Sequence, residues 1–241
     1  MLQKIYDSLL SLAYPQSCQI CRDSVESSAD GAACRQCWLS TRVFTGGETL
    51  CAKCSAVLSL EKSAPDQTFC HRCDDHFYDA ARAVGLYEKA LAASVLFLKT
   101  EPFVGRTARA LFTAAFENSP FRDATVIFPV PLSKKRARER GFNQAEILAA
   151  VLAKEFALEI DRQTLARKIH TPLHRAAMDA RARELTVENA FEVTRPKLVE
   201  NRKILLVDDV FTSGATASAC ARALRRQGAE RVYVMTLARV L

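Results

Sequence analysis

Apolar runs alternate with helical periodicities along residues 83–237 of this 241-residue chain. Short runs rich in Val, Ile and Leu predict buried strands at 83–87, 124–130, 203–207 and 231–237. Between them, apolar residues recur at helical spacing and predict helices at 88–99, 107–117, 143–156 and 215–227. Continuous apolar strands that alternate with helices indicate an α/β fold, a parallel sheet flanked by helices.

The first 77 residues lack this alternation. Residues 1–15 have apolar positions at helical spacing, but Asp7 interrupts them and no A-x-A cleavage site follows, so we expect an amphipathic helix instead of a signal peptide. The apolar run at 90–98 is too short to cross a bilayer, which predicts a cytoplasmic protein without membrane insertion. We therefore expect two domains, residues 1–77 and 78–241.

Eight of the nine cysteines form four C-x-x-C pairs in the first domain. The pairs are Cys18/Cys21, Cys34/Cys37, Cys51/Cys54 and Cys70/Cys73. One such turn directs two thiolates at one point, and two pairs complete a tetrahedral zinc site. The sequence thus predicts a Cys-rich double zinc ribbon with two structural zinc ions, paired either sequentially or in an interleaved way. Disulfides are disfavoured in the absence of a secretory signal.

Other residues of this region and the ninth cysteine have simpler interpretations. His71, between Cys70 and Cys73, is a candidate substitute ligand, but we expect it to face outward, as a residue between two such cysteines more often does. Trp38, Phe44 and Phe69 are candidates for packing on the second domain or on their own ribbon. Cys220 is expected to be a small buried core residue.

The net charge of +7 is unevenly distributed. Residues 1–78 hold seven Lys/Arg against nine Asp/Glu, while the remainder holds 27 against 18 and carries +9. A basic second domain fits an anionic partner, either a phosphorylated metabolite or nucleic acid.

Two acids and a turn of small residues follow the strand at 203–207. The acids are Asp208 and Asp209, and the turn is Thr212, Ser213, Gly214, Ala215 and Thr216. Free backbone N–H groups in such a turn, together with the dipole of the helix it opens, form a cradle for phosphate. Paired carboxylates suit ribose hydroxyls or Mg²⁺. The alternative is a plain strand-to-helix turn with an acidic cap.

A second loop closes the strand at 124–130. It consists of Pro129, Val130, Pro131, Leu132 and Ser133, and its place at the end of a strand suits a pyrophosphate group. A basic run follows, with Lys134, Lys135, Arg136, Arg138 and Arg140 within seven residues. Such a run binds an anion or nucleic acid, or it simply solubilises the chain.

Taken in order, these motifs resemble one family. The four C-x-x-C pairs, PVPLS at 129–133, R-x-R-x-RGFNQAE at 136–146 and LLVDDVFTSGAT at 205–216 resemble the ComF family, also called ComFC or GntX-like. That family joins a double zinc ribbon to a type I phosphoribosyltransferase-like domain, which binds phosphoribosyl pyrophosphate (PRPP).

The resemblance implies roles for the matching residues. Asp208 and Asp209 would hold the ribose of PRPP directly or through Mg²⁺ and so serve catalysis. Residues 212–216 would bind its 5′-phosphate, and residues 129–133 its pyrophosphate. Arg140, Asn143 and Gln144 match the family signature.

Residues 167–190 stand where the family has a flexible lid, and here the chain departs from the pattern. His174 replaces a Gln, Thr186 an Asn and Asn189 a Gly. Contacts to the acceptor are therefore less well predicted than PRPP binding. His170 and His174 are the candidates for a general base, although a loop histidine is more often simply solvated.

The resemblance implies three functional hypotheses. The favoured one is uptake or processing of transforming single-stranded DNA, with DNA-uptake proteins as partners. The others are a metabolic, Mg²⁺-dependent phosphoribosyltransferase with an unknown acceptor, and a regulator that senses PRPP without turnover.

Overall fold

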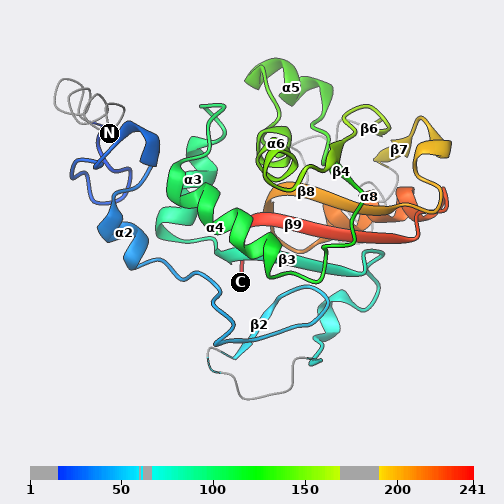
Figure 1. The fold of residues 1–241 in the computed structure, drawn as a ribbon, viewed down its shortest axis with the longest axis horizontal. Coiled ribbons are helices and arrows are strands. Elements are labelled where there is room, and N and C mark those ends of the chain that lie inside the picture. Colours follow the sequence, from blue (N-terminus) through cyan, green and yellow to red (C-terminus); the bar gives the residue numbers. More distant parts are fainter. Residues whose placement is uncertain (1–15, 60, 62–66, 169–189) are drawn as a thin grey trace, which may run out of the picture.

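A five-stranded parallel sheet forms the centre of the fold, in the order β3-β9-β8-β4-β5 (Figure 1). The computed structural model describes residues 16–59, 61, 67–168 and 190–241. The strands are β3 (Ala80–Leu86), β4 (Val126–Pro129), β5 (Glu159–Ile160), β8 (Lys203–Phe211) and β9 (Arg231–Arg239). The strands expected from apolar runs are β3, β4, β8 and β9, so the parallel α/β prediction is confirmed.

Helices cover both faces of this sheet. They are α3 (Lys89–Phe97), α4 (Arg106–Glu117), α6 (Gln144–Phe156) and α8 (Ala215–Arg225), which are the helices that periodicity predicts. Side chains alternate along β8, so Leu205 and Val207 join the core beneath α3, α4 and α6, whereas Ile204 and Leu206 join the core beneath α8. Cys220 lies fully buried in the α8 core, as expected.

The remaining elements are short. They are η1 (Ser28–Asp30), α2 (Arg35–Leu39), β1 (Thr49–Leu50), β2 (Val57–Ser59), η2 (His71–Cys73), α5 (Lys134–Arg140), β6 (Leu165–Arg167), β7 (Phe191–Val193) and η4 (Pro196–Leu198). The antiparallel β6–β7 pair packs against α8 through β7. The expected helix at 1–15, His170, His174 and most of the expected lid segment lie outside the described residues. Within the described part of the chain, no helix is both long and apolar enough to span a membrane.

Two elements differ from the sequence prediction. Strand β8 continues four residues beyond Val207, because Asp208, Val210 and Phe211 stay in register with β9. The basic run at 134–140 is a helix, α5, although its apolar content is too low to signal one. Ser133 caps α5 by accepting a hydrogen bond from the Arg136 amide, and Gly141 ends it in the left-handed conformation.

The two cysteine-rich segments lie on opposite faces of the sheet. Cys18, Cys34, Cys37 and Trp38 belong to the core that contains α3 and α4, whereas the cysteines of residues 51–73 border the core beneath α8. Of the aromatic candidates for packing, Trp38 is buried in the first of these cores, whereas Phe69 is exposed. In Figure 1 the chain descends from α2 to β2 past the edge of the sheet. The boundary between residues 77 and 78 stays a prediction.

The connecting segment 42–44 adds to the edge of β3. The Phe44 amide donates to the Val84 carbonyl, the Leu86 amide donates to the Arg42 carbonyl, and Val43 forms a bridge with Gly85. The backbones approach so closely that a Cβ on Gly85 would lie 2.2 Å from the Arg42 oxygen. Only glycine fits there.

The Gly85→Ala substitution is therefore expected to push segment 42–44 off the edge of β3. We expect the free energy of unfolding in urea to fall by about 2 kcal/mol, in the range for overpacking. Gly47→Ala is the control, because its Cβ would meet only the Thr45 hydroxyl at 3.7 Å. Equal stability of the two variants would show that the close approach is absent in solution.

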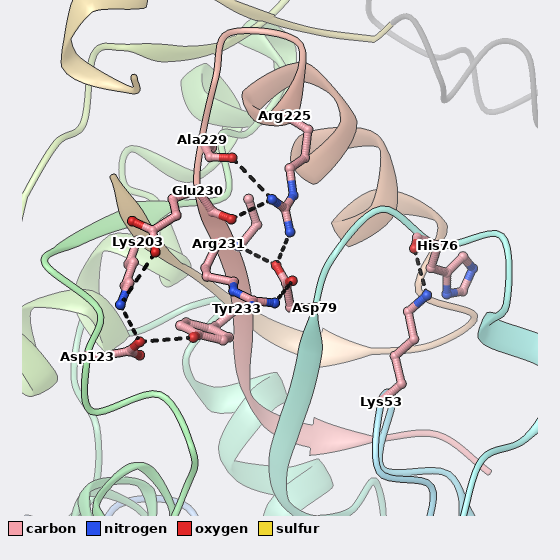
Figure 2. A network of polar contacts seen from close by, with 11 residues as sticks. Lys53, His76, Asp79, Asp123, Lys203, Arg225, Ala229, Glu230, Arg231 and Tyr233 are labelled. Carbon is pink, nitrogen blue, oxygen red and sulfur yellow. Dashed lines mark hydrogen bonds and ion pairs between the residues drawn. The ribbon is translucent and has the colours of Figure 1, made fainter. Parts of the chain in front are cut away.

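A partly buried carboxylate fastens β3 to β9 (Figure 2). Asp79, just before β3, accepts hydrogen bonds from the guanidinium groups of Arg225 and Arg231 and from the Val232 amide. Arg225 also donates to the carbonyls of Ala229 and Glu230. The end of α8 and the starts of two strands are thus held by charge-assisted hydrogen bonds.

Candidate functional site

The eight paired cysteines form two four-sulfur clusters. One contains Cys18, Cys21, Cys34 and Cys37, and the other contains Cys51, Cys54, Cys70 and Cys73. Within each cluster all sulfur atoms lie within 4.8 Å of one another. The pairing is therefore sequential, and the interleaved alternative does not apply.

The sulfur spacing fits zinc. The Sγ atoms of Cys18 and Cys37 lie 3.7 Å apart, as do those of Cys51 and Cys73, while Cys54 and Cys70 are separated by 3.5 Å. A tetrahedron with Zn–S bonds of about 2.3 Å has edges of about 3.8 Å. His71 is fully exposed and outside the cluster, as predicted. These are two closed Cys₄ sites suited to structural zinc.

The acid pair lies where β8 extends past its neighbour β4. The last paired residue of β4 is Pro129, opposite Val207, so Asp208 and Asp209 are flanked by β9 on one side only. Beyond Pro129, no β4 residue lies beside β8. This position is at the carboxyl edge of the parallel sheet, where ligands bind in open α/β folds. Both residues are partly exposed, while the carboxyl group of Asp208 is the part that neighbouring atoms enclose.

The surroundings of Asp208 disfavour the charged form of its carboxyl group. Burial raises the pKa of the Asp208 carboxyl well above its usual range, and repulsion from Asp209 acts in the same direction. The Asp209 amide, which donates to Asp208 at 2.9 Å, and the charge of Arg167 oppose this rise. A divalent cation beside the pair would favour the ionised form, so the donor set fits Mg²⁺.

The turn after β8 depends on glycine. Gly214 has φ +84°, in the left-handed region, and stands directly before the first residue of α8. Thr212, Ser213 and Ala215 around it are exposed, and the N-cap Gly214 has no side chain to cap the helix, although the Ser213 hydroxyl accepts a hydrogen bond from the Ala215 amide at 3.4 Å. The remaining amides at the N-terminus of α8 are suited to an anion, and phosphate binding by this turn stays a prediction.

The loop at 129–133 leaves the sheet beside the acid pair. Its Val130 amide donates to the Val207 carbonyl, next to Asp208. The side chain of Asn143 donates to the Val130 carbonyl at 3.1 Å and accepts from the Ala145 amide at the start of α6. Asn143 therefore holds this loop in place. Gln144 is 2 % exposed, and its Nε2 makes no hydrogen bond with described residues.

Helix α5 carries the basic run away from the sheet (Figure 1). Lys134, Lys135, Arg136 and Arg138 are exposed and Arg140 is partly exposed, while Glu139 offsets one charge through a 3.9 Å ion pair with Lys135. The structure thus brings the acid pair and the loop at 129–133 together and places the cations on an arm that starts at that loop.

Residues 76–78, which follow the second cysteine cluster in the sequence, contact the turn and its neighbours. A Cβ on Gly214 would lie 2.8 Å from Cε1 of His76, and Tyr78 packs edge-on against Phe211. The Phe77 amide donates to the Ser218 hydroxyl in α8. Sequence reasoning missed His76, because no local pattern links it to a residue 138 positions away.

Comparisons with known proteins agree with this architecture. A model of the double zinc ribbon domain matches residues 9–75, and a model of the phosphoribosyl transferase domain matches residues 139–241. The fold expectation of a type I phosphoribosyltransferase-like sheet behind a double zinc ribbon is therefore confirmed.

Similar curated proteins have names that refer to DNA utilization or to competence. "DNA utilization protein YhgH" of Salmonella typhimurium is 29% identical over 238 residues, 95% of this chain and 100% of its own length. "Competence protein F" of Haemophilus influenzae is 28% identical over 92% of this chain and 96% of its own. "Competence protein ComFC" of Bacillus subtilis is 35% identical over 119 residues, which span 47% of this chain and 44% of that relative.

Proposed function

We propose that this chain, which combines the double zinc ribbon and the phosphoribosyltransferase domain of ComF-type proteins, binds PRPP with Mg²⁺ and acts on transforming single-stranded DNA. The observation that carries the proposal is the grouping at one sheet edge of the acid pair, the phosphate turn and the loop at 129–133. Names of competence proteins among the homologues support the cellular process.

The geometry suggests how the site would handle PRPP. The 5′-phosphate would lie at the turn 212–216, the ribose hydroxyls at Asp208 and Asp209, and the pyrophosphate near 129–133. Mg²⁺ would neutralise the leaving pyrophosphate. Transfer of the phosphoribosyl group to an acceptor develops positive charge on the sugar ring, which the carboxylates would stabilise.

The basic arm is the proposed contact to DNA. Helix α5 exposes its cations to solvent beside the site. The phosphates of a single DNA strand can therefore bind along this helix. Replacing both Lys134 and Arg138 by Gln is expected to weaken binding of an oligodeoxynucleotide and to reduce the slope of log K against log salt by about 1.4, at about 0.7 per phosphate contact.

The matched control replaces Arg109 and Lys154 by Gln, since both are exposed on the outer surfaces of α4 and α6. It removes the same charge. Fluorescence anisotropy from low to high salt gives both slopes. Identical slopes for the two double variants would refute a role of α5 in DNA binding.

Measurement of PRPP turnover distinguishes a phosphoribosyltransferase from a regulator that only binds PRPP. Pyrophosphate released from PRPP only when single-stranded DNA is present would identify the strand as the acceptor. PRPP binding without pyrophosphate release would favour the regulatory role.

A further inference from the structure

A cavity of 430 Å³ separates the second cysteine cluster from the phosphate turn. On the cluster side it is lined by Arg72 and His76, and on the turn side by Thr212, Ser213 and Ala215. This volume is within the range of about 300–1,000 Å³ typical of ligand sites. The cavity is bounded by two segments that are far apart in the sequence, and we call it the knuckle cavity.

The lining of the knuckle cavity favours an anion. Its lining includes two arginines, a histidine and two hydroxyl side chains beside two cysteines of the second cluster, Cys54 and Cys73, and none of its described residues is Asp or Glu. Arg72 is exposed and makes no hydrogen bond or ion pair with described residues. Its charge is therefore available to a ligand.

Arg239 adds a second, independent sign of a polar ligand. It is only 7 % exposed, and one of its terminal nitrogens donates to the Cys54 carbonyl at 2.6 Å. Its Nε makes no hydrogen bond with the described residues, although unpaired buried donors are rare. A guanidinium beside the cavity thus has an unused donor.

The wall on the cluster side is fixed in place. Lys53, next to Cys54, donates to the His76 carbonyl at 2.8 Å (Figure 2), and Nδ1 of His76 lies 2.6 Å from the hydroxyl of Tyr78. The ring of His76 touches Gly214, so the position of the histidine and the conformation of the turn depend on each other.

We propose that the knuckle cavity is a phosphate-binding subsite, in which Arg72 and His76 of the zinc ribbon act together with the hydroxyls of Thr212 and Ser213. The phosphate belongs either to PRPP, in which case the inference rests on the proposed function, or to a nucleic-acid strand. The zinc ribbon then contributes directly to ligand recognition, beyond supporting the fold.

The test titrates the zinc-loaded full chain with inorganic phosphate, with PRPP and Mg²⁺, and with an oligodeoxynucleotide that carries or lacks a 5′-phosphate. Arg72→Gln is compared with Arg35→Gln, which removes an exposed arginine from the first cluster. His76→Gln is a second variant. Zinc content and circular dichroism confirm that each variant is folded.

We expect Arg72→Gln to weaken phosphate binding about fivefold or more, as loss of a charge-assisted hydrogen bond does, with little change in Arg35→Gln. A parallel loss for PRPP identifies PRPP as the source, and a loss only for the 5′-phosphorylated strand identifies nucleic acid. Unchanged binding of phosphate, PRPP and the 5′-phosphorylated strand in both Arg72→Gln and His76→Gln overturns the subsite, even where the wild type binds PRPP. In a further outcome, the wild type binds inorganic phosphate but not PRPP, and Arg72→Gln weakens phosphate binding. This result supports the subsite and refutes the proposed function.

Discussion

Removal of zinc from the two Cys₄ clusters is expected to unfold residues 16–78 and to loosen both faces of the sheet. Binding of a structural zinc ion contributes on the order of 10 kcal/mol to folding of small domains, as much as the whole stability of many proteins. Because one cluster borders the core under α3 and α4 and the other borders the core under α8, the loss reaches both cores. Chelation followed by circular dichroism and thermal unfolding measures it.

Cysteine variants separate the two sites. Cys21→Ser and Cys70→Ser should each lower the zinc content from two ions to one per chain, whereas Cys220→Ala should keep two, since Cys220 is outside both clusters. A metal-free protein with the same melting temperature as the zinc-loaded form would contradict this expectation, as would four disulfides.

Gly214→Ala is expected to weaken PRPP binding at least about tenfold, or about 1.4 kcal/mol. Alanine disfavours the φ of +84°, and its Cβ would lie 2.7 Å from the Phe211 ring and 2.8 Å from His76. The turn then shifts, and the amides that face the phosphate shift with it. Calorimetric titration with PRPP and Mg²⁺ gives the change in affinity.

Gly46→Ala is the matched control for this variant. Gly46 has a similar φ of +89°, yet a Cβ there would meet nothing within 4 Å. It therefore imposes the same backbone cost far from any close contact. PRPP affinities that fall equally in both variants would mean that only global stability had changed.

The parallel sheet was predictable because its strands are continuous apolar runs, and the zinc sites were predictable because ligand spacing is local. The length of β8 was not, because Asp208 and Asp209 have low strand propensity and are held by pairing with β9. Helix α5 was not predictable from apolar periodicity either. It has a capping serine and a terminal glycine but no apolar face.

Part of the candidate site was predictable from the sequence and part was not. The acids, the phosphate turn and the loop at 129–133 follow directly after apolar strands, so their place at one sheet edge was predictable. The contribution of His76, Arg72 and Arg239 depends on tertiary packing between residues more than 130 positions apart, as the Phe77–Ser218 hydrogen bond illustrates. The roles of all these residues in binding PRPP stay a prediction.

The most direct test of the PRPP site is calorimetric titration of the zinc-loaded protein with PRPP and Mg²⁺, beside the double variant Asp208→Asn/Asp209→Asn. We predict binding by the wild type and a loss of at least about a hundredfold in the variant, since each hydrogen bond to a charged group contributes about 1.5–3 kcal/mol. The melting temperature of the variant should not fall. Absence of PRPP binding by the wild type, or equal binding by both proteins, would contradict the account.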